Sequence, residues 1–411
     1  MLYDTEKKTT TSALTIPLHK EFSYAYYTSI HDFGQEEWEA ALPYKNFFLD
    51  YRYLKCVEEL KADQNYFRYA IVYRKHQPIG VVYFQVSDFT ASLFGKLIET
   101  QFNALSKGKL SLFQAKLQKH NNSVLMRLLT CGNNYVSGEH GFLFDSSLQE
   151  TLKLDILERL IAEVAKKEKL RGRISGMLIK DFYSPLPLSK CMFGTSNYME
   201  FKVEPNMIVD IPDQVSSLTE YIGCFSKKYR NRAKQILKAG SALEVRELNE
   251  QEILALYDAI FALYEQVYNN AKFKLAKLDA RYFYEMKKIF RERFIMVGYF
   301  RDGKLVSFLS AIRLEHELEA HYIGVDYSIN KELELYQNLL YKYIELAIER
   351  RIKRVNLGRT ASEIKSTVGA KAYDLHCYVR PQNTLSKLVL KPFCTFLQPS
   401  EWIPRNPFKE E

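Results

Sequence analysis

The chain has 411 residues, of which 47% are hydrophobic and 26% charged, and its formal net charge is +9. This composition is that of a soluble globular protein long enough for two domains, and it excludes a membrane-spanning chain, since no run reaches the ~18 apolar residues that a membrane helix requires. The first 20 residues also lack the apolar core of a signal peptide, so we expect a cytoplasmic protein. The positive charge favours anionic partners without choosing among them.

The cysteines and histidines give no sign of a metal site. The six cysteines are dispersed and form no C-x-x-C pair, a pattern typical of reduced, mostly buried thiols. The segment from His316 to His321 resembles the zinc signature H-E-x-x-H, but its histidines are five residues apart, and we interpret it as a turn between strands. A P-loop and a G-x-S-x-G elbow are absent as well, so we expect no metal and no tightly bound cofactor.

We expect residues 1–20 to form a loosely ordered N-terminal lead segment, which precedes the first half of the chain. Hydrophobic alternation and periodicity predict an α/β arrangement there. In chain order we expect a strand from Phe22, a short helix around Trp38, a helix over 46–60, a hairpin over 69–86, a basic amphipathic segment over 103–122, a strand over 125–131, a glycine-rich turn over 132–138, a helix over 148–167 and a strand over 174–179.

The second half repeats this order with little residue identity. A hairpin over 294–314 matches the first hairpin, and a strand, helix and strand over 320–357 match those over 125–179. Such a repeat predicts two tandem α/β domains with mixed sheets. We place them at residues 21–205 and 206–383, with a C-terminal tail over 384–411.

The clearest element is the helix of the second half, because apolar residues recur along it at steps of three and four. Those residues are Tyr336, Leu339, Leu340, Tyr343, Ile344, Ala347 and Ile348. Ser328 or Asn330 is expected to cap its start. A strand, a helix and a returning strand form a crossover, and this places the chemistry at the strand ends and the loops that follow them.

A second helix, over 226–238, carries most of its cations at one end. The cluster of Lys227, Lys228, Arg230 and Arg232 suggests binding of phosphate, either on a diphosphate substrate or on tRNA. A solvated helix face is the alternative interpretation.

The tail over 384–399 mixes large apolar residues with Lys387 and Lys391. Such a segment can dock on a bilayer if the protein acts on a lipid-linked molecule. Because Pro392 interrupts a long surface helix, we expect the tail instead to close the C-terminal domain.

The phrase FSKKYRNRAKQILKAG, followed about a hundred residues later by YIGVDYSINKELELYQNLLYKYIELAIERRIKRVNLGRTASEIKSTVGA, resembles the FemAB-like acyltransferases of the GNAT superfamily. The resemblance covers mainly residues 207–380. It implies two tandem GNAT-type domains and the transfer of an acyl or aminoacyl group from acyl-CoA or aminoacyl-tRNA to an amine. The acceptor would be a small molecule or a cell-wall precursor, which can be phosphorylated or lipid-linked.

One segment departs from the wider superfamily. Acetyl-CoA-dependent members carry Q/R-x-x-G-x-G/A where the helix begins, whereas residues 327–334 contain no glycine and include two glutamates. FemAB-like relatives that use aminoacyl-tRNA also lack these glycines, so both donors stay open.

Three residues are candidates for the chemistry. Lys365 matches the position where the family has a lysine near the transferred carbonyl, and an ammonium group there would stabilise the oxyanion; a solvated loop lysine is the alternative. Asp326 at a strand end can accept a proton from the amine, or it caps a turn. Tyr322 can line the acceptor cleft, or it takes part in aromatic packing.

Three further residues are candidates for substrate binding. Arg359 directly follows a strand end and can hold a phosphate or carboxylate, or it forms an ion pair with Asp326 or Glu363. Asn356 belongs to the same strand end, and Tyr327 can line the cleft beside Tyr322.

Two other classes of function fit the sequence. A protein on this fold can have lost its chemistry and bind a ligand without turnover. It can also bind tRNA without catalysis, if the helix over 226–238 and the basic segment over 103–122 form one surface.

Overall fold

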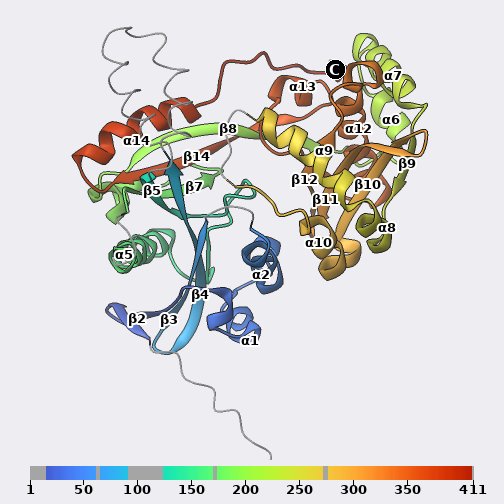
Figure 1. Cartoon of the computed structure of the whole chain (residues 1–411). Helices are drawn as coiled ribbons and strands as arrows, with labels where there is room; N and C mark the ends of the chain where they lie inside the picture. Colours follow the sequence, from blue (N-terminus) through green and yellow to red (C-terminus); the bar gives the residue numbers. More distant parts are fainter. Residues whose placement is uncertain (1–14, 62–64, 91–123, 170–173, 272–275, 410–411) are drawn as a thin grey trace, which may run out of the picture.

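The computed structural model describes residues 15–61, 65–90, 124–169, 174–271 and 276–409. One mixed sheet of 14 strands runs through both halves in the order β1-β2-β3-β4-β5-β7-β14-β8-β13-β12-β11-β10-β9, with β6 beside β4 (Figure 1). The strands are β1 (Ile16–His19), β2 (Phe22–Tyr27), β3 (Tyr66–Arg74), β4 (Gln77–Thr90), β5 (Val124–Cys131), β6 (Phe142–Phe144), β7 (Gly176–Phe182), β8 (Met199–Asp210), β9 (Glu244–Glu247), β10 (Phe294–Arg301), β11 (Lys304–Arg313), β12 (Glu317–Val325), β13 (Arg354–Asn356) and β14 (Lys371–Pro381).

The strand order shows the duplication predicted from the sequence. Read from either end toward the middle, β3-β4-β5-β7-β14 mirrors β10-β11-β12-β13-β8. The pairs β5–β7 and β12–β13 are both parallel, as crossover connections require. The last strand of each half pairs with the other half, since β14 joins β7 and β8 joins β13. Each half therefore completes the other's sheet, and the boundary expected near Asn206 falls inside β8.

The beginning of the chain contains one more strand than expected. Residues 16–19 of the predicted lead form β1, which pairs with β2. The basic segment expected over 103–122 lies outside the described residues. The other predicted elements of the first half are present as α1 (Gln35–Ala40), α2 (Tyr51–Glu59), the β3–β4 hairpin, β5, α5 (Glu150–Glu168) and β7.

The interpretation of 316–321 as a turn is wrong. The chain turns at residues 314–316, where the Leu314 amide donates to the Glu317 carbonyl over 2.9 Å, and β12 has begun by Glu317. The alternation of polar and apolar residues in this segment reflects a strand with one face on a core. His316 is exposed, whereas the ring of His321 lies 2.7 Å from the Tyr282 hydroxyl.

The predicted helix of the second half is α12 (Leu335–Glu349), which joins β12 to β13. A short helix, α11 (Asn330–Leu333), precedes it, and Glu334 between them is left-handed with φ of 50°. Asn330 is the first residue of α11 and not the N-cap of α12, a position that Glu334 takes without a side-chain cap bond, although the Asn330 side-chain oxygen accepts from the Tyr336 amide of α12 over 3.0 Å. The other predicted cap, Ser328, bonds to Asp326 instead.

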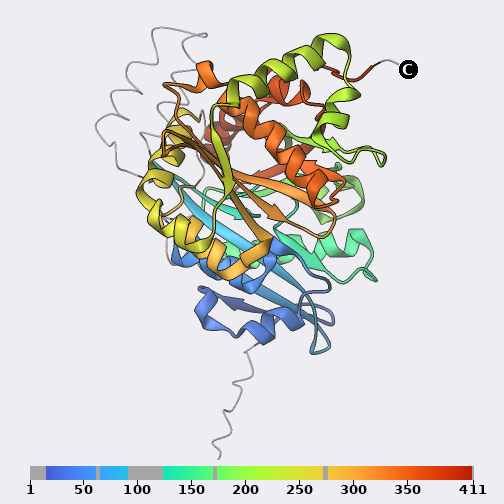
Figure 2. The same ribbon diagram turned by 90° about the vertical axis from the view of Figure 1, so that its right-hand side faces the viewer.

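Helices cover both faces of the sheet. In the second half, α6 (Leu218–Gly223), α7 (Lys227–Gly240) and α12 share one core with the strands. The opposite face is covered by α8 (Glu250–Ala255), α9 (Tyr257–Asn270) and α10 (Tyr282–Phe290). Figure 2 shows α12 in orange and α9 in yellow on the two sides of these strands. In the first half, α5 packs on the face formed by β4, β5 and β7.

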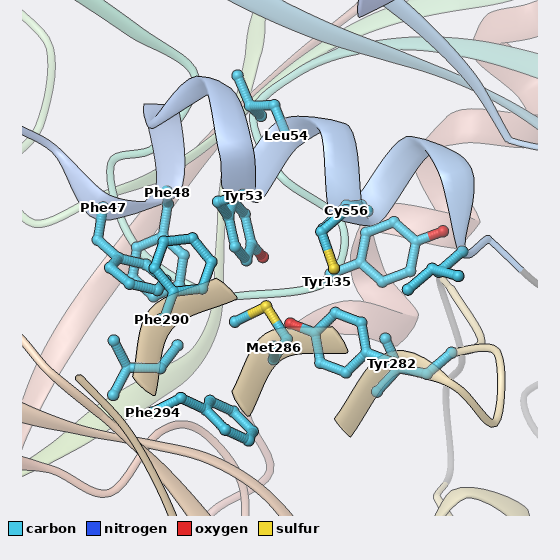
Figure 3. Packing of buried hydrophobic residues seen from close by; sticks show 14 of the residues in the cluster. Phe47, Phe48, Tyr53, Leu54, Cys56, Tyr135, Tyr282, Met286, Phe290 and Phe294 are labelled. Atoms are coloured by element: carbon cyan, nitrogen blue, oxygen red, sulfur yellow. The ribbon is translucent and has the colours of Figure 1, made fainter. Parts of the chain in front are cut away.

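A single aromatic core joins the two halves. Helix α2 of the first half packs against α10 of the second, as Figure 3 shows for Tyr53 and Cys56 above Tyr282 and Met286. The ring centroids of Phe47 and Phe290, one from each half, are 4.5 Å apart. Because this contact is buried and tightly packed, it holds α2 and α10, and with them the two halves, together.

The C-terminal tail begins with α14 (Thr384–Leu397), which lies along β8 and β14 (Figure 1). Its Leu390 and Phe393 are buried against Phe89, Leu128 and Leu178 of the first half. The tail therefore does not simply close the C-terminal domain as predicted, because the central strands present apolar side chains from both halves to it. No helix in the described part of the chain is long and apolar enough to cross a membrane.

We expect weak binding of the protein to vesicles that contain anionic lipid, because Leu390 and Phe393 of α14 are already buried in the fold. Co-sedimentation of the full chain with such vesicles measures this. Strong binding that disappears on truncation after Arg380 would contradict it.

Candidate functional site

The pairing of two parallel strands in the second half ends after three residues. β12 and β13 pair only over residues 317–319 and 354–356, after which β13 ends and β12 continues to Val325. The register of β12 against β11 shifts between Leu309 and Ala311. Bulges often lie beside active sites, and open α/β sheets bind ligands beyond the carboxyl ends of their strands. We take this point as the candidate site.

A buried carboxyl group, Glu319, lies where the strands separate. It pairs directly with Asn356 on β13, so both side chains are on the same face of the sheet. Glu319 is 5% exposed, and this burial raises its pKa well above the usual value, with the neighbouring Glu317 carboxyl adding to the effect. Glu319 is not among the residues predicted from the sequence; the two carboxylates at i and i+2, Glu317 and Glu319, in an alternating segment were the signal for it.

Lys365 lies in the short helix α13 (Ser362–Ser366) and is 4% exposed, so it is not a solvated loop residue. Its Nζ donates to the carbonyls of Gly358 and Arg359 over 3.1 and 2.6 Å. Burial lowers the pKa of Lys365 to about 7, while Glu319 opposes this shift. An ammonium group has three donors, so one N–H remains for a substrate.

The loop that binds Lys365 has an unusual backbone. Gly358, Thr360 and Ala361 have φ values of 72°, 66° and 52°. A β-branched residue rarely adopts this left-handed conformation, and such strain is concentrated at functional sites. The loop thereby turns two carbonyls toward the Lys365 ammonium.

Arg359 has a different partner from either one considered above. Its guanidinium lies 3.7 Å from Asp181 of the first half. Asp326 instead bonds to Ser328, and Glu363 accepts from Arg405. Sequence reasoning could not find this pair because the two residues are far apart in the chain and meet only through the exchanged central strands.

The structure brings together Lys365, Arg359 and Asn356, and it places Asp326 elsewhere. Asp326 is seven residues beyond Glu319, which corresponds to roughly 20 Å along a strand at about 3.3 Å per residue. Its carboxylate accepts two bonds from Ser328, as a turn cap does.

The two predicted cleft tyrosines have separate surroundings. The Tyr322 hydroxyl donates to the Tyr135 carbonyl of the first half over 2.6 Å, and its ring packs edge-on against Tyr264. Tyr327 is exposed, and its amide donates to Gln266. Tyr322 is therefore part of the contact between the halves, beside the register shift in β12.

The predicted cationic cluster lies on α7, in the helical layer of the second half. Lys227, Lys228 and Arg232 are exposed and Arg230 is half-buried. Arg232 forms an ion pair of 2.6 Å with Glu334, at the start of α12. Part of the positive charge is thus balanced within the protein.

We expect the double substitution Lys227→Glu and Lys228→Glu to weaken binding of an anionic substrate and to leave the fold intact, because both side chains are exposed. The loss should shrink at high salt, since such attraction is screened over about 10 Å at 0.1 M ionic strength. Titration at two salt concentrations measures this, with circular dichroism as the control. Unchanged affinity would show that this face is merely solvated.

The C-terminal segment 399–409 crosses back to the second half and contacts α13, as its path in Figure 1 shows. The Arg405 amide donates to Ser366 Oγ and its guanidinium to Glu363, both over 3.0 Å. The ring of Phe408 packs edge-on between Tyr221 and Phe225. We call this segment the C-terminal strap.

We expect Phe408→Ala to loosen the helix that carries Lys365, at a cost of about 1–2 kcal/mol in unfolding free energy. Lys365 should then react faster with acetic anhydride and titrate closer to a normal lysine. Competitive labelling followed by mass spectrometry measures both. Ile403→Ala, an exposed position of the same strap, is the matched control; equal labelling in the two variants would contradict the expected effect.

A separate cavity of about 410 Å³ lies between α6, α7 and α12. Its lining includes Leu237, Tyr299 and Tyr341 and none of the candidate site residues.

Comparison by sequence matches residues 225–366 to the model of the acetyltransferase (GNAT) domain. This range contains β12, β13 and Lys365, so the similarity lies in the second half of the chain. No curated protein matches the chain.

Comparison of folds finds the crystal structure of FemX, with a TM-score of 0.51 and 12% identity over 87% of this chain and 98% of that one. A tandem GNAT protein from the clavulanic acid biosynthesis pathway has a TM-score of 0.47 and 9% identity over 88% and 99%. The C-terminal domain of a putative lysylphosphatidylglycerol synthetase from Agrobacterium fabrum has 0.42 and 13% over 66% and 83%. The FemX likeness concerns the fold alone, and the two weaker ones carry no argument.

Proposed function

We propose, from the premise that this chain has the FemAB-like tandem GNAT fold with a GNAT domain at residues 225–366, that it is an N-acyltransferase. It would move an acyl or aminoacyl group from a thioester or ester to an amine. The observation that carries the proposal is that Glu319, at the end of the β12–β13 pairing, and Lys365, bonded to the loop after β13, are both buried and that their charges interact.

Glu319 is the proposed proton acceptor, in place of Asp326. When the amine nitrogen attacks the carbonyl carbon, a C–N bond forms and the nitrogen must lose a proton. A carboxylate whose pKa is raised by burial is a stronger base than a solvated one. Asn356, opposite Glu319 on β13, orients the carboxylate.

Lys365 is the proposed oxyanion partner. Two of its donors are held by the carbonyls of Gly358 and Arg359, which aims the third. As the carbonyl oxygen gains negative charge, this preorganised N–H stabilises it. The intermediate then collapses, the C–S or C–O bond breaks, and the leaving thiol or hydroxyl takes up a proton from solvent.

The two possible donors, acyl-CoA and aminoacyl-tRNA, require different features at the start of α12. A CoA pyrophosphate needs free amides and little negative charge there. The segment 327–334 has no glycine, and the Glu334 carboxylate occupies this helix start, paired with Arg232. These features favour an aminoacyl ester over acyl-CoA. The acceptor would be an amine on a small molecule or a cell-wall precursor.

Mass spectrometry of molecules retained by the purified protein tests the proposal, together with transfer assays that use acyl-CoA and aminoacyl-tRNA. We expect turnover with one donor and its loss in Lys365→Ala. A retained ligand without turnover under either condition would favour a non-catalytic ligand-binding or tRNA-binding protein, the alternative on this fold.

A further inference from the structure

Two side chains beside the site have donors that no acceptor uses in the described part of the chain. The Arg359 guanidinium lies 3.7 Å from Asp181, which is outside hydrogen-bond range. The Tyr183 hydroxyl accepts from Asn206 Nδ2 over 2.8 Å, and this leaves its own proton free. Asn206 is fully buried, and its side-chain oxygen also lacks a partner among the described residues.

The register of the central strands places Tyr183 on the face of the site. Asn206 is two residues before Ile208 in β8, and Ile208 pairs with Asn356. Side chains two residues apart share a face, so Asn206 and Asn356 are diagonal neighbours, about 7–8 Å apart. The Tyr183 hydroxyl, bonded to Asn206, therefore lies close to the face that carries Glu319.

Asp181 fixes Arg359 from the side of the first half. It is fully buried, accepts from the Gly138 amide over 3.3 Å and is in ion-pair contact with Lys180. Burial alone would raise the pKa of Asp181, but Lys180 and Arg359 keep it below the usual value, so it stays charged. Lys180 and Arg359 are two cations around one carboxylate, Asp181, so these three side chains together carry an excess positive charge.

Tyr183 supplies a neutral donor next to this charge. Burial raises the pKa of its hydroxyl, and the Glu319 carboxyl adds to the shift, so the group keeps its proton. The residue as a whole is 38% exposed, so Tyr183 lies at the border between solvent and the buried Asn206 that its hydroxyl contacts. A guanidinium fork and a phenolic O–H together match a carboxylate or a phosphate.

We propose that Arg359 and Tyr183 form a subsite for an anionic oxygen group, a carboxylate or a phosphate, carried by the acceptor amine. The first half is then part of the active site, because it supplies Tyr183 and, through Asp181, positions Arg359. The anion-binding subsite itself does not depend on the proposed function. Only the statement that the bound molecule is the acceptor amine rests on it.

Binding to matched amine probes tests the subsite. The pairs are L-alanine with L-alaninamide and O-phosphoethanolamine with ethanolamine, measured by calorimetry on the full chain. We expect the carboxylate or phosphate member of a pair to bind and the member without this anionic group not to bind, and the pair that responds identifies the anion. Tyr183→Phe should weaken binding by about 10- to 100-fold, the effect of one hydrogen bond to a charged group, and Arg359→Gln by at least as much.

Tyr44→Phe is the matched control, since Tyr44 is the more exposed tyrosine at 58% and lies outside the site. Asp181→Asn should weaken anion binding as well and shift the affinity less than Arg359→Gln. Equal binding of both members of each pair, no binding of any probe, or unchanged affinity in Tyr183→Phe overturns the subsite. Anion binding without any transfer activity would instead refute the proposed function and leave the subsite standing.

Discussion

Lys365→Ala should reduce turnover by about a hundredfold or more and change substrate affinity little. Removing a hydrogen-bond donor to the oxyanion generally has this effect, because the lost hydrogen bond is made only in the transition state. The carbonyls of Gly358 and Arg359 fix the ammonium, so a longer side chain does not fit the same geometry. Lys365→Arg should therefore rescue poorly. Steady-state kinetics with the identified donor and acceptor measure both variants.

The rate should also fall as the pH rises above about 7, because Lys365 loses its proton there.

The lowered pKa of Lys365 also predicts how the free energy of unfolding depends on pH. The unfolded chain binds a proton at Lys365 between about pH 7 and 10 that the folded chain does not, so wild-type stability rises across this window. The change in melting temperature caused by Lys365→Ala should then be more favourable at pH 6 than at pH 9. Wild-type turnover in a well-folded Lys365→Ala protein would contradict the catalytic role of Lys365 and leave it only a structural role.

Glu319→Gln should lower turnover by roughly 10²- to 10⁴-fold, the usual contribution of a positioned base. Glutamine keeps the shape and the hydrogen bonds of the side chain but cannot take a proton from the amine. Glu317→Gln is the matched control on the same strand, because its carboxylate is held by Arg354 at 2.8 Å and is not the proposed base.

The control variant Glu317→Gln has its own expected effect on the pH dependence of the rate. The Glu317 carboxyl raises the pKa of Glu319, so Glu317→Gln should move the acidic limb of the rate profile to lower pH while turnover at the optimum stays within a few fold. Rate profiles for the three proteins measure this. A Glu319→Gln variant as active as wild type would refute the assignment of the base.

The sequence alone determined the repeating order of elements, because each half carries its own periodic and alternating segments. The apolar face of residues 336–348 specified α12, and the two hairpins specified β3–β4 and β10–β11, through contacts between residues close in the chain. The resemblance to FemAB-like proteins pointed to Lys365, and the fold likeness to FemX agrees with the tandem arrangement it implied. Local signals also specified the cationic helix α7.

Only the tertiary structure decided which residues meet at the site. Glu319 became a candidate once the parallel pairing of β12 and β13 placed it opposite Asn356, since alternation by itself does not say which face is buried. Arg359 meets Asp181 because β8 and β14 exchange between the halves, and such a contact between distant residues leaves no periodic trace in the chain. The shifted pKa of Lys365 likewise arises from burial, a property of the packed fold and not of the sequence around it.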